Sequence, residues 1–590
     1  MRKKHFLFAS VLALLCGSST LHAQDFKLTS SGYFKNQGVD VMAFDDIYPE
    51  GHQGGVCIIM NGHRVATNGD IRLEATPGQW QPVPKQLDRK LGDNSITATL
   101  CYPDSSRHLT GFNPMIYPDL HLIYTVNVES KGKNIEVTVD LDRPIPQEFI
   151  GKVGFNLEFF PGSLFGKPWI MDGQSGIFPQ QPNSPLMTTQ PNYLHTGNYH
   201  DGKKSLADMD KLIGKGYSPI VADDIISEPY AKGTKFTSRP DDPYNKVTIE
   251  SLSGDLQLFD GRMNHNNGWF VLRSNIKPGV TKGAVKWIIT PNVVADWMYQ
   301  PVIQTSQIGY HPTQDKEAVI EMDIRDNRKE TAQIIRIDAD GEKVVKNVTP
   351  ANWGKFLRYN YLKVNFTDVK EPGLYKIKYN TSVSPIFRID NDVYARGVWQ
   401  PVLEYFLPVQ MCHMRVNEKY RVWHDCCHMD DAQMAPAHNH IDGYDQKEGL
   451  SKFKPGEVVP GVNIGGWHDA GDFDLRIESQ AGESYILALA YEAFHPNLDV
   501  TSIDQINRVT EIHQPDGKND LLQQVENGAL TVVNGYLALG RLYRGIICND
   551  LRQYVLLGDA AAMTDGKIGN EDDRWIFTED NPGRELSTAA

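Results

Sequence analysis

The sequence predicts a multidomain chain: a large β-sandwich, then a small β-sandwich, then an all-α unit. Its 590 residues exceed the roughly 250 to 300 at which a single hydrophobic core stops growing. Short β-type runs between turn clusters fill residues 24–301 and 302–391, whereas a period of 3.6 residues begins after residue 391. We therefore expect an export signal over 1–23 and domains at 24–301, 302–391 and 392–590.

Residues 1–23 have the pattern of an export signal. A positively charged start is followed by an apolar stretch over 6–16, and small residues precede a cleavage site before Gln24. A lipid anchor at Cys16 is the alternative, and it is disfavoured because Leu15 stands where a small residue is needed. We expect an exported protein, either periplasmic or extracellular.

The charge of the chain limits its partners. A formal net charge of −14 and a pI near 5.7 argue against nucleic acid and anionic membrane surfaces, which attract basic patches. After residue 23 no apolar run reaches the roughly 20 residues that span a bilayer. The sequence therefore predicts no membrane span and permits an uncharged substrate.

The first 300 residues read as all-β, with runs such as 135–139 and 269–272. The length suggests an oversized sandwich of the kind seen in sugar-mutarotase-like domains, although no motif requires that analogy. Residues 302–391 carry alternating runs at 318–324 and 374–379 with a turn signal just before the second. About ninety residues in about seven strands predict an immunoglobulin-like sandwich.

The C-terminal third reads as all-α. We expect amphipathic helices over 393–407, 483–494 and 520–547.

The segment 465–474 holds the residues most suited to chemistry. Asp469 and Asp472 lie three positions apart, so one turn directs both carboxylates to the same side. Neighbouring glycines leave room for a bulky ligand, and Trp467 offers a flat apolar face to a sugar ring. An inverting glycosidase needs one carboxylate to activate water and a distant carboxylic acid. Taken alone, such a pair is weak evidence of catalysis, because it more commonly caps a helix or binds calcium.

Residues 465–472 resemble the Gly-Gly-Trp-x-Asp-Ala-Gly-Asp signature of glycoside hydrolase family 9. The run 307–312 resembles the start of the immunoglobulin-like domain that precedes the catalytic barrel in one branch of that family. Segments 427–432 and 520–522 resemble motifs upstream and downstream of the signature. The resemblance covers about residues 302–590 and leaves the first domain without a counterpart.

The resemblance implies an (α/α)6 barrel that hydrolyses β-1,4-glucans with inversion, with Asp472 as general base and Asp469 helping to position the water. Cellulose, xyloglucan or mixed-linkage glucan would be the substrate, and the action endo. The family's general acid is a Glu far downstream, so we expect this chain to hold only the N-terminal part of the catalytic domain. The late acidic residues read as solvated charge: Glu571, Glu579 and Glu585.

The same region predicts a metal site. Zinc prefers four Cys and His ligands in a tetrahedron, and the resemblance implies a structural zinc on Cys412, Cys427, His428 and His468. A Cys412–Cys426 disulfide is one alternative, and calcium without an identifiable ligand set is another. Other residues that could replace a ligand are Cys426, His413, His424, His438 and His440.

A non-catalytic glycan-binding or scaffold protein is the rival hypothesis. The lack of an assignable acid and the two β-sandwich domains motivate it. An independent activity of the first domain has no identifiable catalytic set behind it.

Overall fold

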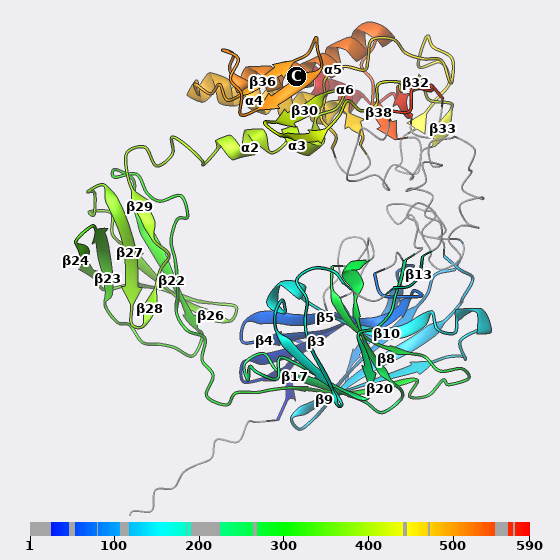
Figure 1. Cartoon of the computed structure of the whole chain (residues 1–590), viewed down its shortest axis with the longest axis vertical. Helices are drawn as coiled ribbons and strands as arrows, with labels where there is room; N and C mark the ends of the chain where they lie inside the picture. The colour runs from blue at the N-terminus through cyan, green and yellow to red at the C-terminus, as the bar shows by residue number, and fades with distance from the viewer. Residues whose placement is uncertain are drawn as a thin grey trace, which may run out of the picture.

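The computed structural model describes residues 25–45, 54–78, 81–104, 106, 117–183, 186–189, 225–263, 268–439, 445–469, 473–548, 564–569 and 573–590. Among the residues discussed above, those outside this part are the export signal, Gln24, Asp472, His440, Glu571 and the side chain of His438. Figure 1 shows three units that follow one another along the chain.

The N-terminal unit is an antiparallel β-sandwich. Within the described residues it has two nine-stranded sheets. The first has the order β1 (Lys27–Leu28), β2 (Phe34–Asn36), β3 (Val39–Ala43), β4 (Val56–Met60), β5 (His63–Leu73), β10 (Val153–Phe159), β19 (Phe270–Asn275), β18 (Leu256–Asp260), β15 (Ala231–Gly233). The second has the order β12 (Gln174–Ile177), β11 (Pro168–Met171), β16 (Lys235–Ser238), β17 (Val247–Ser251), β20 (Val285–Pro291), β9 (Asn134–Leu141), β8 (Ile123–Lys131), β7 (Ser95–Cys101), β6 (Lys85–Leu91).

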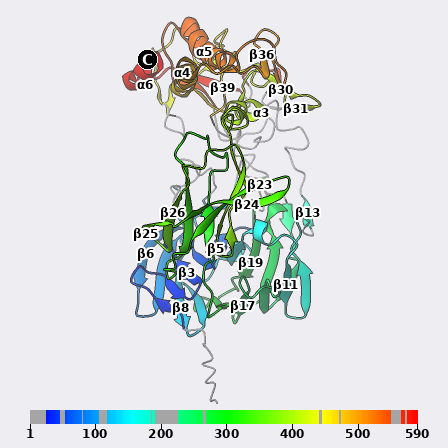
Figure 2. The same ribbon diagram turned by 90° about the vertical axis from the view of Figure 1, so that its left-hand side faces the viewer.

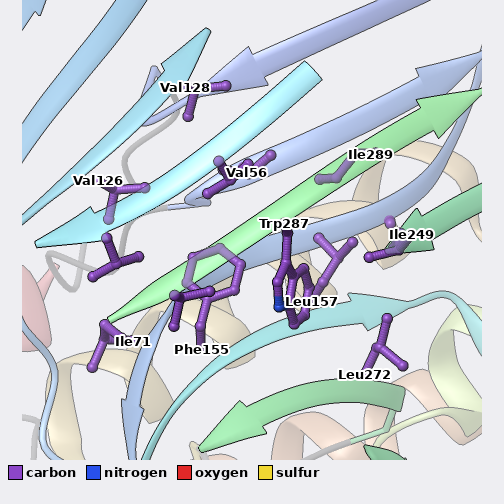
Figure 3. Packing of buried hydrophobic residues seen from close by; sticks show 14 of the residues in the cluster. Val56, Ile71, Val126, Val128, Phe155, Leu157, Ile249, Leu272, Trp287 and Ile289 are labelled. Atoms are coloured by element: carbon purple, nitrogen blue, oxygen red, sulfur yellow. The ribbon is translucent and has the colours of Figure 1, made fainter. Parts of the chain in front are cut away.

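Alternate side chains of these strands form the core between the two sheets. Every second residue of β9 is buried, as expected for a sheet with one face against a core. Phe155 and Trp287 meet edge to face with centroids 5.0 Å apart, and Figure 3 shows them beside Leu157. The smaller elements of this unit are β13 (Leu186–Thr189), β14 (Ile225–Ser227), η2 (Gln147–Phe149), η3 (Pro161–Ser163) and η5 (Gly261–Met263).

The second unit is the small sandwich that the sequence predicts. One sheet has the order β21 (Val302–Gln304), β22 (Glu317–Asp323), β26 (Tyr359–Asn365), β25 (Ala351–Phe356). The other contains β24 (Gly341–Val348), β23 (Ala332–Asp338), β27 (Gly373–Tyr379), β28 (Ser382–Val383), with β29 (Phe387–Ile389) also on β27. Its core includes Ile320, Leu362 and Ile377.

The C-terminal unit is not all-α, so that prediction is wrong. Its helices are α2 (Gln400–Glu404), α3 (Leu407–Gln410), α4 (Ile477–Phe494), α5 (Asp520–Leu539) and α6 (Pro582–Ala589). One sheet has the order β31 (Arg421–His424), β30 (Arg415–Glu418), β37 (Val509–Ile512), β36 (Thr501–Asp504). A second has the order β32 (Gln433–Met434), β39 (Arg574–Phe577), β38 (Gly545–Cys548), β35 (Leu475–Arg476), and β33 (His438–Asn439) pairs with β34 (Asp445–Gln446). A twelve-helix barrel is not evident in the described part of this unit.

Proline and glycine account for the helix boundaries that the sequence analysis missed. The helix expected over 393–407 is instead two short helices, each with a proline in its first turn. Pro408 has no N–H to donate within a helix that continues from α2, so α2 ends and a separate helix, α3, begins. α5 ends at Leu539 rather than near 547 because Gly540 adopts the left-handed conformation (φ 76°) that closes a helix.

The helices α4 and α5 pack against each other. Figure 2 shows them at the opposite end of the molecule from the N-terminal sandwich. In the described part of the chain, no helix is both long and apolar enough to cross a membrane.

Candidate functional site

The structure brings together the four side chains that the sequence analysis proposed as metal ligands. Cys412, Cys427, His428 and His468 are all buried, and their ligand atoms lie within 4.8 Å of one another. The two Sγ atoms are 3.8 Å apart. Cys412 Sγ lies 3.7 Å from His428 Nδ1, and Cys427 Sγ lies 3.6 Å from His468 Nε2. The four residues form a possible metal site.

These three separations are close to those expected between the ligands of a tetrahedral zinc ion. With Zn–S about 2.3 Å and Zn–N about 2.05 Å, tetrahedral corners lie about 3.8 Å apart between sulfurs and about 3.5 Å apart between sulfur and nitrogen. A disulfide would need about 2.05 Å between sulfurs. Cys412 and Cys426 are both free thiols. The structure therefore contradicts the disulfide alternative and fits zinc.

Two chain segments pair to place the first and last of these residues. Cys412 N donates to Gly466 O at 3.0 Å, and His468 N donates to Gln410 O at 2.7 Å. Cys412 and His468 are thereby held side by side just after α3. The other two candidate ligands, Cys427 and His428, are adjacent in the chain. The left-handed backbone of His428 (φ 55°) turns the chain at this point.

A buried ion pair lies next to the cluster. Arg574 Nε donates to Asp431 Oδ2 at 2.6 Å, and both side chains are fully buried. The same guanidinium donates to Phe473 O at 2.7 Å and lies 3.3 Å from Cys412 Sγ. β39, which carries Arg574, therefore brings a positive charge to the first cysteine.

The electrostatics of the cluster favour metal binding. Burial raises the pKa of the Cys412 thiol, but the hydrogen bond from Cys427 and the charge of Arg574 outweigh it and hold that pKa well below its usual range. Burial and the bond to Cys412 raise the pKa of Cys427. Burial lowers the pKa of both His428 and His468. The imidazoles are therefore neutral at neutral pH, the form that coordinates metals.

The other residues considered as ligands have different partners. His413 Nδ1 lies 2.9 Å from Gly465 O, and Cys426 Sγ faces Arg508 O at 3.8 Å. His424 Nδ1 lies 2.9 Å from the carbonyl of the next residue. None of these three belongs to the metal-ligand cluster found among the described residues.

Asp469, the described member of the predicted carboxylate pair, directly follows His468. Arg476 Nε forms an ion pair with Asp469 Oδ2 at 2.9 Å. Asp469 N donates to Asp474 O at 3.1 Å, and Asp474 Oδ1 accepts from Cys548 N at 2.8 Å. This carboxylate is thus fixed between the candidate metal cluster and the start of α4.

The structure corrects the interpretation of Trp467. Its side chain is 2% exposed and packs in a core cluster with Met411 and Leu407. Its backbone is held by Gln480, whose amide accepts from Trp467 N and donates to Trp467 O, both at 2.8 Å. The ring faces contact protein rather than a surface that a sugar could reach.

The glycines before Trp467 allow the close approach of helix α5 rather than of a ligand. A Cβ on Gly465 (φ +66°) would lie 2.2 Å from Asn527 O of α5, and one on Gly466 (φ +89°) would lie 2.7 Å from Thr531 Oγ1. Gly466 N also donates to Asn527 O at 3.0 Å. α5 therefore occupies the space that the sequence analysis reserved for a substrate.

Gly465→Ala should destabilise the C-terminal unit by roughly 3 to 5 kcal/mol, combining left-handed strain with a backbone clash. Gly456→Ala is the matched control, because Gly456 has φ +78° but only open space where a Cβ would stand. It should cost only about 1 to 2 kcal/mol. Urea unfolding followed by tryptophan fluorescence measures both. Equal costs would contradict the close approach of α5.

Glu483 is a carboxyl near the site that the sequence analysis missed. It stands three residues after Gln480 on α4, so it shares the helix face that holds Trp467. Its Oε2 is buried and has no hydrogen-bond partner among the described residues. Burial, and then the charge of Asp469, raise its pKa from 4.5 to about 7. The sequence places Glu483 one helical turn after Gln480. This spacing indicates a position near the site only once the contact between Gln480 and Trp467 is known.

Glu483→Gln should remove a pH dependence of stability. A raised folded-state pKa gives stabilisation that is complete below the ordinary value of 4.5 and lost as pH rises through about 7. The variant should therefore lose less stability than the parent between these pH values and be the more stable protein at pH 8. Melting temperatures of both proteins from pH 4 to pH 8 test this. Parallel curves would show that Glu483 titrates normally.

The late acidic residues in the described part are engaged in ion pairs. Glu579 Oε1 lies 2.7 Å from Arg584 Nη1, and Glu585 Oε1 lies 3.0 Å from Arg541 Nη2. Both pairs are partly exposed. Glu585 is 34% exposed and agrees with the interpretation as solvated charge. Glu579 does not, because its side chain is only 13% exposed and it also pairs with Arg544.

Comparison with known proteins identifies one domain. Residues 298–384 match the family model described as the cellulase N-terminal ig-like domain. No curated protein matches the chain.

Three similar solved structures show how far the likeness extends. A Zn-binding triple mutant of glycoside hydrolase family 9 endoglucanase J30 is 22% identical over 45% of this chain and 44% of its own, with a TM-score of 0.32. A Bacteroides ovatus GH9 structure is 18% identical over 49% and 46%, with a TM-score of 0.35. A galactose mutarotase related enzyme from Lactobacillus acidophilus is 9% identical over 45% and 98%, with a TM-score of 0.23.

The chain spans less than half the length of the two family 9 structures. These TM-scores are too low to assign a fold, so the assignment rests on the domain match. The chain therefore carries, at residues 298–384, the N-terminal immunoglobulin-like domain of cellulases.

Proposed function

We propose that this chain belongs to an exported glycoside hydrolase of family 9, which hydrolyses β-1,4-glucosidic bonds of plant glucans with inversion and endo action. The observation that carries the proposal is the cellulase immunoglobulin-like domain at 298–384, followed by the signature-like segment 465–472. Asp469 of that segment adjoins the buried Cys/His cluster. Cellulose, xyloglucan and mixed-linkage glucan are the proposed substrates.

The cluster is proposed to hold one structural zinc ion. Its four side chains are at most 2% exposed, which leaves no open position for a substrate or a reactive water, as is typical of structural zinc. Bound zinc would join the segments after α3, at 427–428 and before Asp469. Its contribution would be to fix the position of Asp469, while the hydrolytic chemistry belongs to carboxylates.

In this proposal Asp472 is the general base and Asp469 holds the water with it. The ion pair with Arg476 favours the ionised form of Asp469, which accepts a hydrogen bond from water. A water held by two carboxylates gives up a proton more readily as it attacks the anomeric carbon. The resemblance supplies the roles, and the ion pair with Arg476 supports the one given to Asp469.

Reducing-sugar release from carboxymethylcellulose and xyloglucan tests the proposal. It should be measured for this chain and for any longer product of the same gene, because the match covers only 44% of the similar endoglucanase. Asp472→Asn should lower the rate by roughly 10² to 10⁴. Asp580→Asn is the control, since Asp580 is 67% exposed and 3.8 Å from its partner Arg541.

Two outcomes would contradict the proposal. Hydrolysis that is unaffected by Asp472→Asn would place the reaction elsewhere in the protein. Glycan binding without any hydrolysis by either form would favour the non-catalytic glycan-binding protein instead.

A further inference from the structure

Five aromatic side chains form a continuous row on the immunoglobulin-like unit, called here the aromatic strip. Neighbouring ring centroids lie 5.6 Å apart for Trp353 and Tyr361, and 6.1 Å apart for Tyr361 and Tyr359. The row continues from Tyr359 to Tyr299 at 5.1 Å and from Tyr299 to Trp297 at 6.4 Å. Along the whole row, the distance between successive rings is therefore about the length of one sugar ring.

The strip lies on the outer face of the β21–β22–β26–β25 sheet. Tyr359 and Tyr361 alternate along β26 with Asn360 and Leu362, which are buried. Their side chains consequently point away from the core of the small sandwich. Trp353 on β25 is 57% exposed. Such a face is normally polar, so a run of large rings calls for an explanation.

A single carboxylate fixes two of the rings. Tyr299 donates its hydroxyl to Glu321 Oε1 at 2.8 Å, and Tyr361 donates to Glu321 Oε2 at 3.1 Å. Glu321 stands directly across from Tyr361 in the sheet. Because these rings are already immobilised, a ligand that stacks on them loses less free energy to side-chain ordering.

The strip ends in a hollow between the immunoglobulin-like unit and the N-terminal sandwich. Its volume is about 220 Å³, and its lining includes Trp297, Tyr299, Tyr359, Asp40 and Arg358. Figure 1 shows the β26 end of the small sandwich directed toward the larger one. The hollow is smaller than the roughly 300 to 1,000 Å³ of drug-sized ligand sites. It is therefore of a size for one sugar ring with aromatic walls and polar groups at its edge.

Packing between the two units explains only one end of the strip. A Cβ on Gly38 of the sandwich would lie 2.8 Å from the Trp297 ring, so this ring rests directly on the β2–β3 turn. Trp353 has no such cover, because more than half of its surface is exposed. Contact with the neighbouring domain therefore does not account for the exposed end.

We propose that the aromatic strip binds a single chain of an uncharged, hydroxyl-rich glycan, with a terminal sugar ring in the hollow. Sugar rings present C–H groups that pack on aromatic faces, and Glu321, Asp40 and Arg358 supply partners for hydroxyls. The choice of a β-glucan among such glycans rests on the proposed function.

The ring orientations select the form of the glycan. Tyr359 is tilted by 52° from Tyr299 and by 66° from Tyr361, and Trp353 is perpendicular to Tyr361. Rings that are not coplanar cannot lie together on the flat surface of a crystal. They suit a soluble chain whose sugar rings turn relative to one another. A net charge of −14 disfavours polyanionic glycans.

Affinity electrophoresis of the whole chain tests the strip, in native gels that contain hydroxyethylcellulose or xyloglucan and, for comparison, soluble starch. The β-glucan gels should retard the parent protein. Trp353→Ala should raise the dissociation constant on the order of 3- to 10-fold. Tyr361→Phe keeps the ring but removes the bond to Glu321, so it should have a smaller effect. Tyr420→Ala is the matched control, because this fully exposed ring lies outside the strip, in the C-terminal unit.

The outcomes separate this inference from the proposed function. Absence of retardation, or equal retardation of the parent and Trp353→Ala, overturns the strip as a glycan site. Retardation only by soluble starch overturns the assignment to β-glucans. Retardation that depends on Trp353 supports the strip even where reducing-sugar assays find no hydrolysis, a result that would contradict the proposed function alone.

Discussion

Cys427→Ser is expected to abolish zinc binding and to lower the melting temperature of the C-terminal unit by roughly 6 to 12 °C, corresponding to about 3 kcal/mol. Cys427 Sγ lies 3.8 Å from Cys412 Sγ and 3.6 Å from His468 Nε2, so it joins two corners of the cluster. Without a metal, the remaining polar groups would stay in a dry core without strong partners. Metal analysis should find one zinc per chain in the parent and none in the variant.

Cys426→Ser is the matched control for this experiment. Its thiol is adjacent in sequence but faces Arg508 O, so zinc content and melting temperature should stay close to those of the parent. A chelator should lower the melting temperature of the parent and of Cys426→Ser but leave Cys427→Ser unchanged. A parent that contains no zinc after supplementation, or a Cys427→Ser protein that retains it, would contradict the site.

Asp431→Asn is expected to cost about 3 to 5 kcal/mol of unfolding free energy, because it leaves the buried guanidinium of Arg574 without a compensating charge. Both side chains have no exposed surface, and Nε lies 2.6 Å from Oδ2. Arg574 also contacts Cys412, so the variant should weaken zinc binding as well. Urea unfolding of the zinc-loaded and chelator-treated forms separates the two effects.

Asp338→Asn provides a comparison at the surface. Arg336 Nε lies 2.9 Å from Asp338 Oδ1, but Asp338 is 48% exposed. Exposed ion pairs contribute about 0 to 1 kcal/mol, so this variant should unfold nearly like the parent. Asp431→Asn would have to be as mild as Asp338→Asn to disprove the role of the buried pair.

Local sequence patterns were sufficient for the small sandwich, and the family resemblance supplied the expected metal ligands. The run expected over 318–324 is β22 (Glu317–Asp323), and that over 374–379 lies within β27 (Gly373–Tyr379). In both, alternation between buried and exposed residues is a property of consecutive positions. Cys427 and His428 could be named because zinc prefers Cys and His ligands and because the segment 427–432 resembles a family motif.

Residues distant in the chain decided the rest of the C-terminal unit. β39 (Arg574–Phe577) lies between β38 and β32, and β32 (Gln433–Met434) comes from a segment far from it in sequence. The residue pattern within 573–577 does not predict which strands pair with β39, because pairing energy is gained only after the intervening loops have closed. The all-α prediction failed here for that reason, and also because Pro408 ends a pattern that otherwise looks helical.

The sequence by itself predicted the candidate residues, namely the Cys and His set and the Asp469 and Asp472 pair, and it predicted the strand pattern of the immunoglobulin-like unit. Only the tertiary structure decided that Trp467 is buried by its neighbours and that Glu483 lies near Asp469. The physical reason is that residue type fixes what a side chain can bind. Burial, pKa and exposure depend on which distant segments pack around it.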